Sequence, residues 1–152
     1  MEYIFENVKP SHLIKLYRTA KFFFYKYGLN IIQHLEIVDD RFGVHEIFTQ
    51  TKTVVGFTNP YLSLFNNFWI SDSFIYRHGT VLSPFYKCTI KKLESITSLS
   101  WEEFEMLTRE KTIEELKITS VYDDDGEFAI EDILPEVPNA KYIKQVFVFK
   151  KF

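Results

Sequence analysis

The chain is poor in the residues and segments that mark small secreted proteins. It has a single cysteine, Cys88, so it cannot form an internal disulfide, and paired cysteines are the usual support of small secreted domains. Residues 1–20 lack the long apolar segment and small-residue cleavage site that a signal peptide needs. Both absences predict a reduced, cytoplasmic protein.

Long apolar runs and phosphate-binding loops are also missing. No stretch reaches the roughly 18 consecutive apolar residues that a membrane-spanning helix needs. The best candidate, residues 22–25, is flanked by Lys21 and Lys26. The sequence contains neither G-x-x-x-x-G-K-[ST] nor G-x-G-x-x-G, the glycine-rich patterns that hold phosphates. We therefore expect no membrane span and no cofactor.

Aromatic residues, by contrast, are abundant. Phe, Tyr and Trp make up 18% of the 152 residues, whereas Gly and Pro number five each. Such a composition argues against disorder and favours a packed core that contains a β-sheet. A chain of this length forms one domain, whose core cannot hide all of these rings. Some are expected at the surface, where Tyr and Trp are enriched in protein interfaces.

The pattern of apolar and turn residues predicts a single α+β domain over residues 1–152. Its sheet is expected to be mostly antiparallel, with about five to seven strands, because turn signals at 39–43, 79–80 and 123–126 separate the strand-like segments. The last segment, 141–152, contains four consecutive apolar residues and is predicted to be a central strand. No internal repeat or linker is evident.

One long and two shorter helices are expected. Apolar residues recur at helical spacing over 11–27, with Ser11 as a cap at its start and Gly28 at its end, and this helix should pack on one face of the sheet. Shorter helices are predicted near 60–67, where Pro occupies the first helical position, and over 101–109.

Charge is distributed unevenly along the chain. Residues 101–136 hold 13 Asp/Glu and 3 Lys/Arg, a local net charge of −10, whereas the whole chain has a formal net charge of −3. Local structure explains part of this excess. Glu103 completes a capping box with Ser100, and the Asp-Gly run at 123–126 favours a turn. The remaining acids are balanced either by the basic N-terminal helix or by a basic partner protein.

Candidates for catalysis are few. His12, His34, His45 and His78 are the natural acid–base groups, but they fall on different predicted elements and form no local motif. Cys88 is expected to be a buried structural thiol rather than a nucleophile. A small intracellular enzyme with a histidine/carboxylate site stays open as an alternative function.

The Asp-Asp-Asp-Gly run at 123–126 is similar to a calcium-binding loop only in composition. The EF-hand loop needs an oxygen ligand at position 1, Gly at position 6 and Glu at position 12. Placing Gly126 at position 6 puts Val121 at position 1 and Asp132 at position 12. The run is therefore interpreted as a hairpin turn, and no metal site is expected.

Direct binding to nucleic acid is not expected. It would need a basic patch, and the N-terminal helix carries Lys15, Arg18, Lys21 and Lys26 on its polar side. These cations are interpreted as the solvated face of an amphipathic helix, and the pI of about 5.8 argues against a nucleic-acid partner.

The acidic segment favours binding to a basic protein. A dense anionic surface speeds the encounter with a cationic partner and repels nucleic acid. A small, acidic, aromatic-rich protein has the physical character of bacterial immunity proteins and antitoxins. We therefore predict an inhibitor, not an enzyme, that docks on a cationic toxin such as a nuclease. A structural or adaptor role stays open as an alternative. The predicted partner-binding residues are Trp101, Tyr122, Asp123, Asp124, Asp125, Glu127, Phe128, Glu131 and Asp132.

Overall fold

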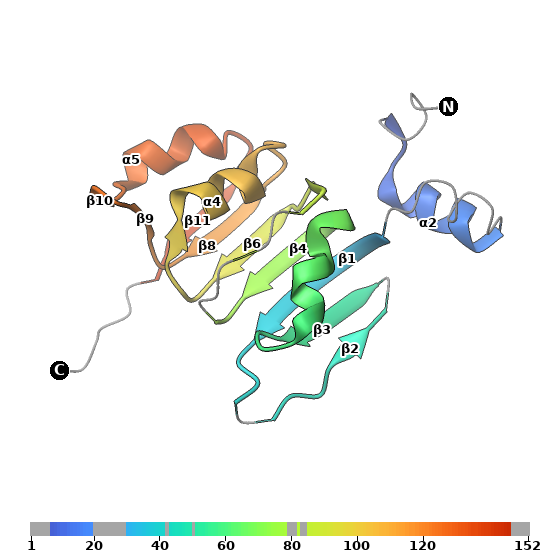
Figure 1. Cartoon of the computed structure of the whole chain (residues 1–152). Coiled ribbons are helices and arrows are strands. Elements are labelled where there is room, and N and C mark those ends of the chain that lie inside the picture. Colours follow the sequence, from blue (N-terminus) through green and yellow to red (C-terminus); the bar gives the residue numbers. More distant parts are fainter. Residues whose placement is uncertain are drawn as a thin grey trace.

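The computed structural model describes residues 7–19, 30–41, 43–49, 51–78, 82 and 85–146. Its largest element is an eight-stranded sheet with strand order β11-β8-β6-β4-β1-β3-β2, in which β5 also pairs with β4 (Figure 1). Its strands are β1 (Asn30–Val38), β2 (Ile47–Phe48), β3 (Lys52–Gly56), β4 (Phe68–Tyr76), β5 (Lys87–Cys88), β6 (Lys92–Ser95), β8 (Glu115–Ile118) and β11 (Tyr142–Gln145).

A smaller sheet and five helical segments complete the described chain. The smaller sheet has the order β10-β9-β7. Its strands are β7 (Leu99–Ser100), β9 (Val121–Asp123) and β10 (Gly126–Glu127). The α-helices are α2 (Pro10–Thr19), α4 (Trp101–Thr108) and α5 (Ile130–Ile133), and the 3₁₀ helices are η1 (Pro60–Asn67) and η2 (Leu134–Glu136).

The large sheet is mostly parallel and has eight strands in a mixed α/β structure, so the prediction of an α+β domain with a mostly antiparallel sheet of about five to seven strands is wrong. β1 runs parallel to both β3 and β4, and β4, β6, β8 and β11 follow one another in parallel. Within the described residues, its single antiparallel pair is β2 with β3. The error has a physical cause. One face of this sheet is open, so strands such as β6 alternate polar and apolar residues, a pattern typical of antiparallel sheets.

Two further fold predictions need correction. The last strand was expected over 141–152 at the centre of the sheet, but its described part, β11, pairs only with β8 and lies at the edge of the described sheet. Residues 147–152 of this prediction lie outside the described residues. The helix predicted over 11–27 is described only as α2, which has 10 residues, and the rest of that span lies outside the described residues. α2 packs on Ile31 and Trp69 in a small cluster of its own, not on the main core.

The C-terminal half repeats one structural unit, although no internal repeat is evident in the sequence. Leu93 of β6 pairs in register with Leu116 of β8, and Leu116 pairs with Ile143 of β11. These positions are 23 and 27 residues apart, within the range of solenoid repeats that contain one strand and one helical segment. Here α4 and then α5 with η2 return the chain to the start of the next parallel strand (Figure 1).

Several local predictions are confirmed. The helix expected over 101–109 is α4, and its capping box is complete: the Glu103 backbone N–H donates to Ser100 Oγ, and the Ser100 N–H donates to the Glu103 carboxylate. The helix expected near 60–67 is η1. β9 and β10 form the antiparallel hairpin expected around 123–126.

The main core lies between the large sheet and its helical layer. Leu35, Phe74 and Leu93 project from the strands and join Phe104 of α4 and Ile133 of α5, all at most 1% exposed. Burial of each such side chain contributes roughly 1.5–3 kcal/mol. The alternate strand residues point to the opposite face. There α2 covers Ile31 and Trp69, and the rest of this face in the described chain is partly exposed to solvent; we call this part the open face. None of the described helices is long and apolar enough to span a membrane.

Candidate functional site

The open face of the sheet places side chains from neighbouring strands in straight rows. His34 of β1 pairs in register with Lys52 of β3 and with Ser73 of β4. Because parallel strands lie about 4.8 Å apart, His34 is a direct neighbour of both Lys52 and Ser73, which flank it on the two adjacent strands. The next row along the strands contains Glu36 and Ile75, which are also in register.

A ladder of ion pairs crosses four strands of this open face. Arg77 follows β4; its Nε donates to Glu36 Oε1 at 2.6 Å, and its Nη1 lies 4.0 Å from Glu94 Oε1. Lys117 Nζ donates to the same Glu94 oxygen at 2.9 Å. The hydrogen bond from Lys117 lowers the pKa of Glu94, against the opposing effect of partial burial. The ladder thus holds β1, β4, β6 and β8 together through half-buried charges.

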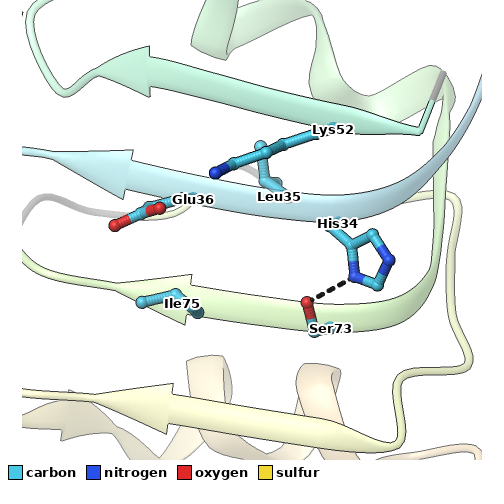
Figure 2. Close-up of a pocket in the computed structure, with 6 residues that line it drawn as sticks. All are labelled: His34, Leu35, Glu36, Lys52, Ser73 and Ile75. Atoms are coloured by element: carbon cyan, nitrogen blue, oxygen red, sulfur yellow. Dashed lines mark hydrogen bonds between the residues drawn. The ribbon is translucent and has the colours of Figure 1, made fainter. Parts of the chain in front are cut away.

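A hollow of about 220 Å³ opens between these rows and is lined by His34, Leu35, Glu36, Lys52, Ser73 and Ile75. Figure 2 shows His34 and Ser73 at one side of it and Glu36 at the other, with Lys52 reaching across Leu35. His34 Nδ1 and Ser73 Oγ lie 2.9 Å apart. Ser–His catalysis also needs a group that orients the histidine. Among the described contacts no carboxylate takes that role, because Glu36 is held by Arg77.

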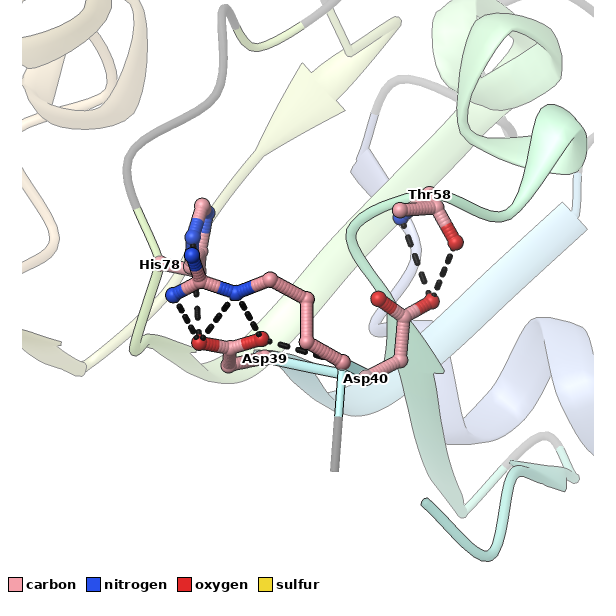
Figure 3. A network of polar contacts seen from close by, with 5 residues as sticks. Asp39, Asp40, Thr58 and His78 are labelled. Carbon is pink, nitrogen blue, oxygen red and sulfur yellow. Dashed lines mark hydrogen bonds and ion pairs between the residues drawn. The ribbon is translucent and has the colours of Figure 1, made fainter. Parts of the chain in front are cut away.

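A second polar network lies at the ends of β1, β3 and β4 (Figure 3). The hydrogen bond from Arg41 lowers the pKa of Asp39 to about 2, and His78 Nε2 lies 3.9 Å from the same carboxylate. Asp40 accepts from Thr58 Oγ1 at 2.5 Å. A Cβ at Gly56 would lie 2.1 Å from Asp40 Oδ2, so this close approach requires glycine.

This network joins strand ends and does not form a metal centre. The ring of His78 stacks on Phe57 with centroids 3.7 Å apart. Within the described chain, no three His, Cys, Asp or Glu side chains gather closely enough to hold a metal ion. His12 lies on α2 and His45 in the loop before β2, and both are exposed. In the described part of the chain, no hydrogen bond or ring contact joins two histidines.

Cys88 does not have the properties of a nucleophile. It is 3% exposed, within the main core. Burial raises the pKa of its thiol to about 12. The thiolate, which is the reactive form, is therefore negligible at neutral pH.

The acidic residues predicted to bind a partner lie around the β9–β10 hairpin and α5. Tyr122 of β9 pairs across the hairpin with Glu127 of β10 and is 45% exposed. Asp123 Oδ1 accepts the backbone N–H groups of Asp125 and Gly126 and so forms the turn. We call the exposed set the hairpin surface. It consists of Tyr122, Asp124, Asp125, Glu127, Glu131 and Asp132.

The two other predicted aromatic anchors, Trp101 and Phe128, lie between the hairpin surface and the main core. The rings of Trp101 and Phe128 stack with centroids 4.4 Å apart and an interplanar angle of 25°. Both are partly buried and pack against the main core. They therefore fix the hairpin onto the start of α4, and Tyr122 is the aromatic side chain of the set that is most open to a partner.

Ion pairs within the described chain balance several acids of the segment 101–136, but none of those on the hairpin surface. Glu114 pairs with Lys141 at 2.5 Å, Glu115 with Lys92 at 3.8 Å, and Glu136 with Lys111. In the described chain, none of the five hairpin-surface carboxylates forms an ion pair. α2, with its basic residues, lies at the opposite end of the molecule from β9, β10 and α5 (Figure 1). The described part of the basic helix thus does not neutralise the hairpin surface.

The open face was not predicted from the sequence, although a repeated pattern of polar and apolar residues indicates it. Each of β6, β8 and β11 contains a core residue flanked by polar residues, as in Lys92-Leu93-Glu94 and Glu115-Leu116-Lys117. An alignment of the chain with itself at an offset of 23 residues would have brought these two triplets together. Comparisons with protein-family models, with curated proteins and with solved structures found no match.

Proposed function

We propose that this protein is a non-enzymatic inhibitor that binds a cationic protein, such as a nuclease toxin, through the hairpin surface. The observation that carries the proposal is the set of five exposed carboxylates without cationic partners among the described residues. Holding like charges together costs free energy through repulsion, and a partner that supplies cations removes this cost. Immunity proteins and antitoxins act on toxins by this kind of association.

The hairpin surface combines long-range attraction with one aromatic anchor. Its carboxylates attract a cationic surface before contact, which raises the association rate constant. Tyr122 then offers a ring with polar and apolar character of the kind that dominates interface energetics. Its neighbour Glu127 can receive a basic side chain that lies over this ring. In a complex with a nuclease, the carboxylates would occupy the surface that otherwise holds phosphates.

Association with one basic protein tests the proposal. A basic protein encoded in an adjacent reading frame is the partner to test; it is co-expressed with this chain, and the mixture is separated by size-exclusion chromatography. We expect a one-to-one complex at low salt and an association rate constant that falls as salt rises. Separate elution of the two proteins at low salt would show that the proposal is wrong.

A matched pair of variants locates the docking surface. The double variant Asp124→Asn/Glu127→Gln removes two charges from the hairpin surface but leaves the turn-forming Asp123 in place. Its control, Glu105→Gln/Glu110→Gln, removes two exposed charges from α4 and the residues just after it. We expect the first to weaken the complex about tenfold or more and the second to change affinity by less than about threefold. Equal losses would assign the effect to net charge alone.

A further inference from the structure

The open face of the large sheet carries a charge opposite in sign to that of the hairpin surface. Its alternate positions, read across β3, β1, β4, β6, β8 and β11, present more cations than acids. The cations are Lys52, Arg77, Lys92, Lys117 and Lys144, and the acids are Glu36, Glu94 and Glu115. Each of these acids is ion-paired within the face. In the described chain, Lys52 and Lys144 form no ion pair.

The hollow beside Lys52 is the place on this face where a side chain of a ligand can bind. Its volume of about 220 Å³ is below the roughly 300–1,000 Å³ of pockets that bind whole small molecules, and it suits a single side chain. Lys52 can donate to a carboxylate placed there, while Ile75 offers an apolar wall. The two cations of this face that form no ion pair in the described chain, Lys52 on β3 and Lys144 on β11, have β1, β4, β6 and β8 between them. A ligand that contacts both must therefore extend over several strands.

We propose that the open face is a second docking surface, which binds an acidic segment of a partner protein and receives one of its carboxylate side chains in the Lys52 hollow. A peptide fits the arrangement better than a nucleic acid does. Glu36, Glu94 and Glu115 lie on the same face and repel a strand with a phosphate at every step, whereas a peptide can place its acids at intervals. This inference is independent of the hairpin surface.

Nuclear magnetic resonance with two blocked hexapeptides tests the proposal. One alternates Glu and Ala, and its control alternates Gln and Ala. At low salt, titration of the Glu peptide is expected to shift the backbone amide signals of His34, Lys52 and Ser73 until they saturate. The Gln peptide should leave them unchanged. For each lysine variant described below, well-dispersed backbone amide signals confirm that the variant keeps the fold.

Two lysine variants, an oligonucleotide and a test for self-association show whether the proposal holds. Lys52→Gln should weaken Glu-peptide binding by about three- to tenfold, as expected for one partly exposed charge-assisted contact. Lys9→Gln, an exposed lysine before α2, should leave it unchanged. The proposal is wrong if no saturable shift occurs at the hollow, or if both lysine variants lose affinity equally. It is also wrong if a thymidine oligonucleotide binds the hollow more tightly, or if the chain self-associates at low salt through Lys52.

Discussion

The carboxylates of the open face are ion-paired, whereas those of the hairpin surface form no ion pair in the described chain. On the open face, Glu36, Glu94 and Glu115 each contact a cation from a neighbouring strand or strand end. On the hairpin surface, five carboxylates, including Asp124 and Glu127, form no ion pair within the described chain. Glu36 and Glu94 are partly buried, and such paired charges hold strands in place, whereas the pair of Glu115 with Lys92 is exposed. Unpaired, exposed charges add repulsion and attract other molecules. The difference separates acids that maintain the fold from acids that are available for binding.

Glu94 should give the largest effect on stability. Its side chain is 13% exposed and lies between Lys117 and Arg77. Glu94→Gln removes the charge that balances these two cations, so we expect a loss of about 1–3 kcal/mol in the free energy of unfolding. Urea denaturation at pH 7 measures it, with Asp124→Asn as the control. Equal stability of the two variants would remove the distinction between the two surfaces.

The same carboxylate should make stability depend on pH in the acid range. The hydrogen bond from Lys117 lowers the pKa of Glu94 in the folded state, so the unfolded chain binds more protons there. Stability from this group is therefore fully present above the unfolded pKa of about 4.3 and is lost as pH falls through the folded pKa. We expect the stability gap between wild type and Glu94→Gln to shrink steadily below about pH 4. A gap that widens towards low pH would contradict this pairing.

Variants of Asp123 should show whether the hairpin depends on the hydrogen bonds of this side chain or on its charge. Its Oδ1 accepts the backbone N–H groups of Asp125 and Gly126 at 2.8 and 3.1 Å. Asp123→Ala leaves both donors without this acceptor and should cost about 1 kcal/mol, whereas Asp123→Asn keeps an oxygen in place and should cost less. Thermal unfolding of the two variants measures the difference. If Asn is as disruptive as Ala, the carboxylate charge matters more than the turn.

The smallest effect on stability is expected from the exposed hairpin carboxylates. Asp124→Asn/Glu127→Gln removes no hydrogen bond or ion pair present among the described residues. We expect the free energy of unfolding to stay within about 0.5 kcal/mol of wild type, with any change towards higher stability as repulsion is relieved. A loss above about 1 kcal/mol in urea denaturation would show that these carboxylates support the fold.

Local features of the fold could be predicted because adjacent residues encode them. The capping box uses Ser100 and Glu103, three positions apart, and the hairpin turn needs only Asp123 to Gly126. Both rest on hydrogen bonds between a side chain and nearby backbone, which the residue types themselves indicate. The acidic residues of the candidate site could be found for the same reason, since a run of charge is visible in the sequence.

The pairing of strands could not be predicted in this way. β1 pairs with β3 and β4, and the partners of His34 are Lys52 and Ser73, which lie 18 and 39 residues away. A strand with one open face alternates polar and apolar residues whether its neighbour is parallel or antiparallel. The open face arises only when parallel pairing places such distant residues in one row. The separation of α2 from the acidic segment likewise depends on the whole fold.

The most direct test of the hairpin surface is the salt dependence of association with the basic partner. The rate constant for wild type is measured over a range of salt concentrations and compared with Asp124→Asn/Glu127→Gln and with Glu105→Gln/Glu110→Gln. We expect the hairpin variant to associate about three- to tenfold more slowly at low salt and to depend less on salt. The α4 control should follow wild type. Identical rate constants for the two double variants would contradict a docking role for the hairpin-surface carboxylates.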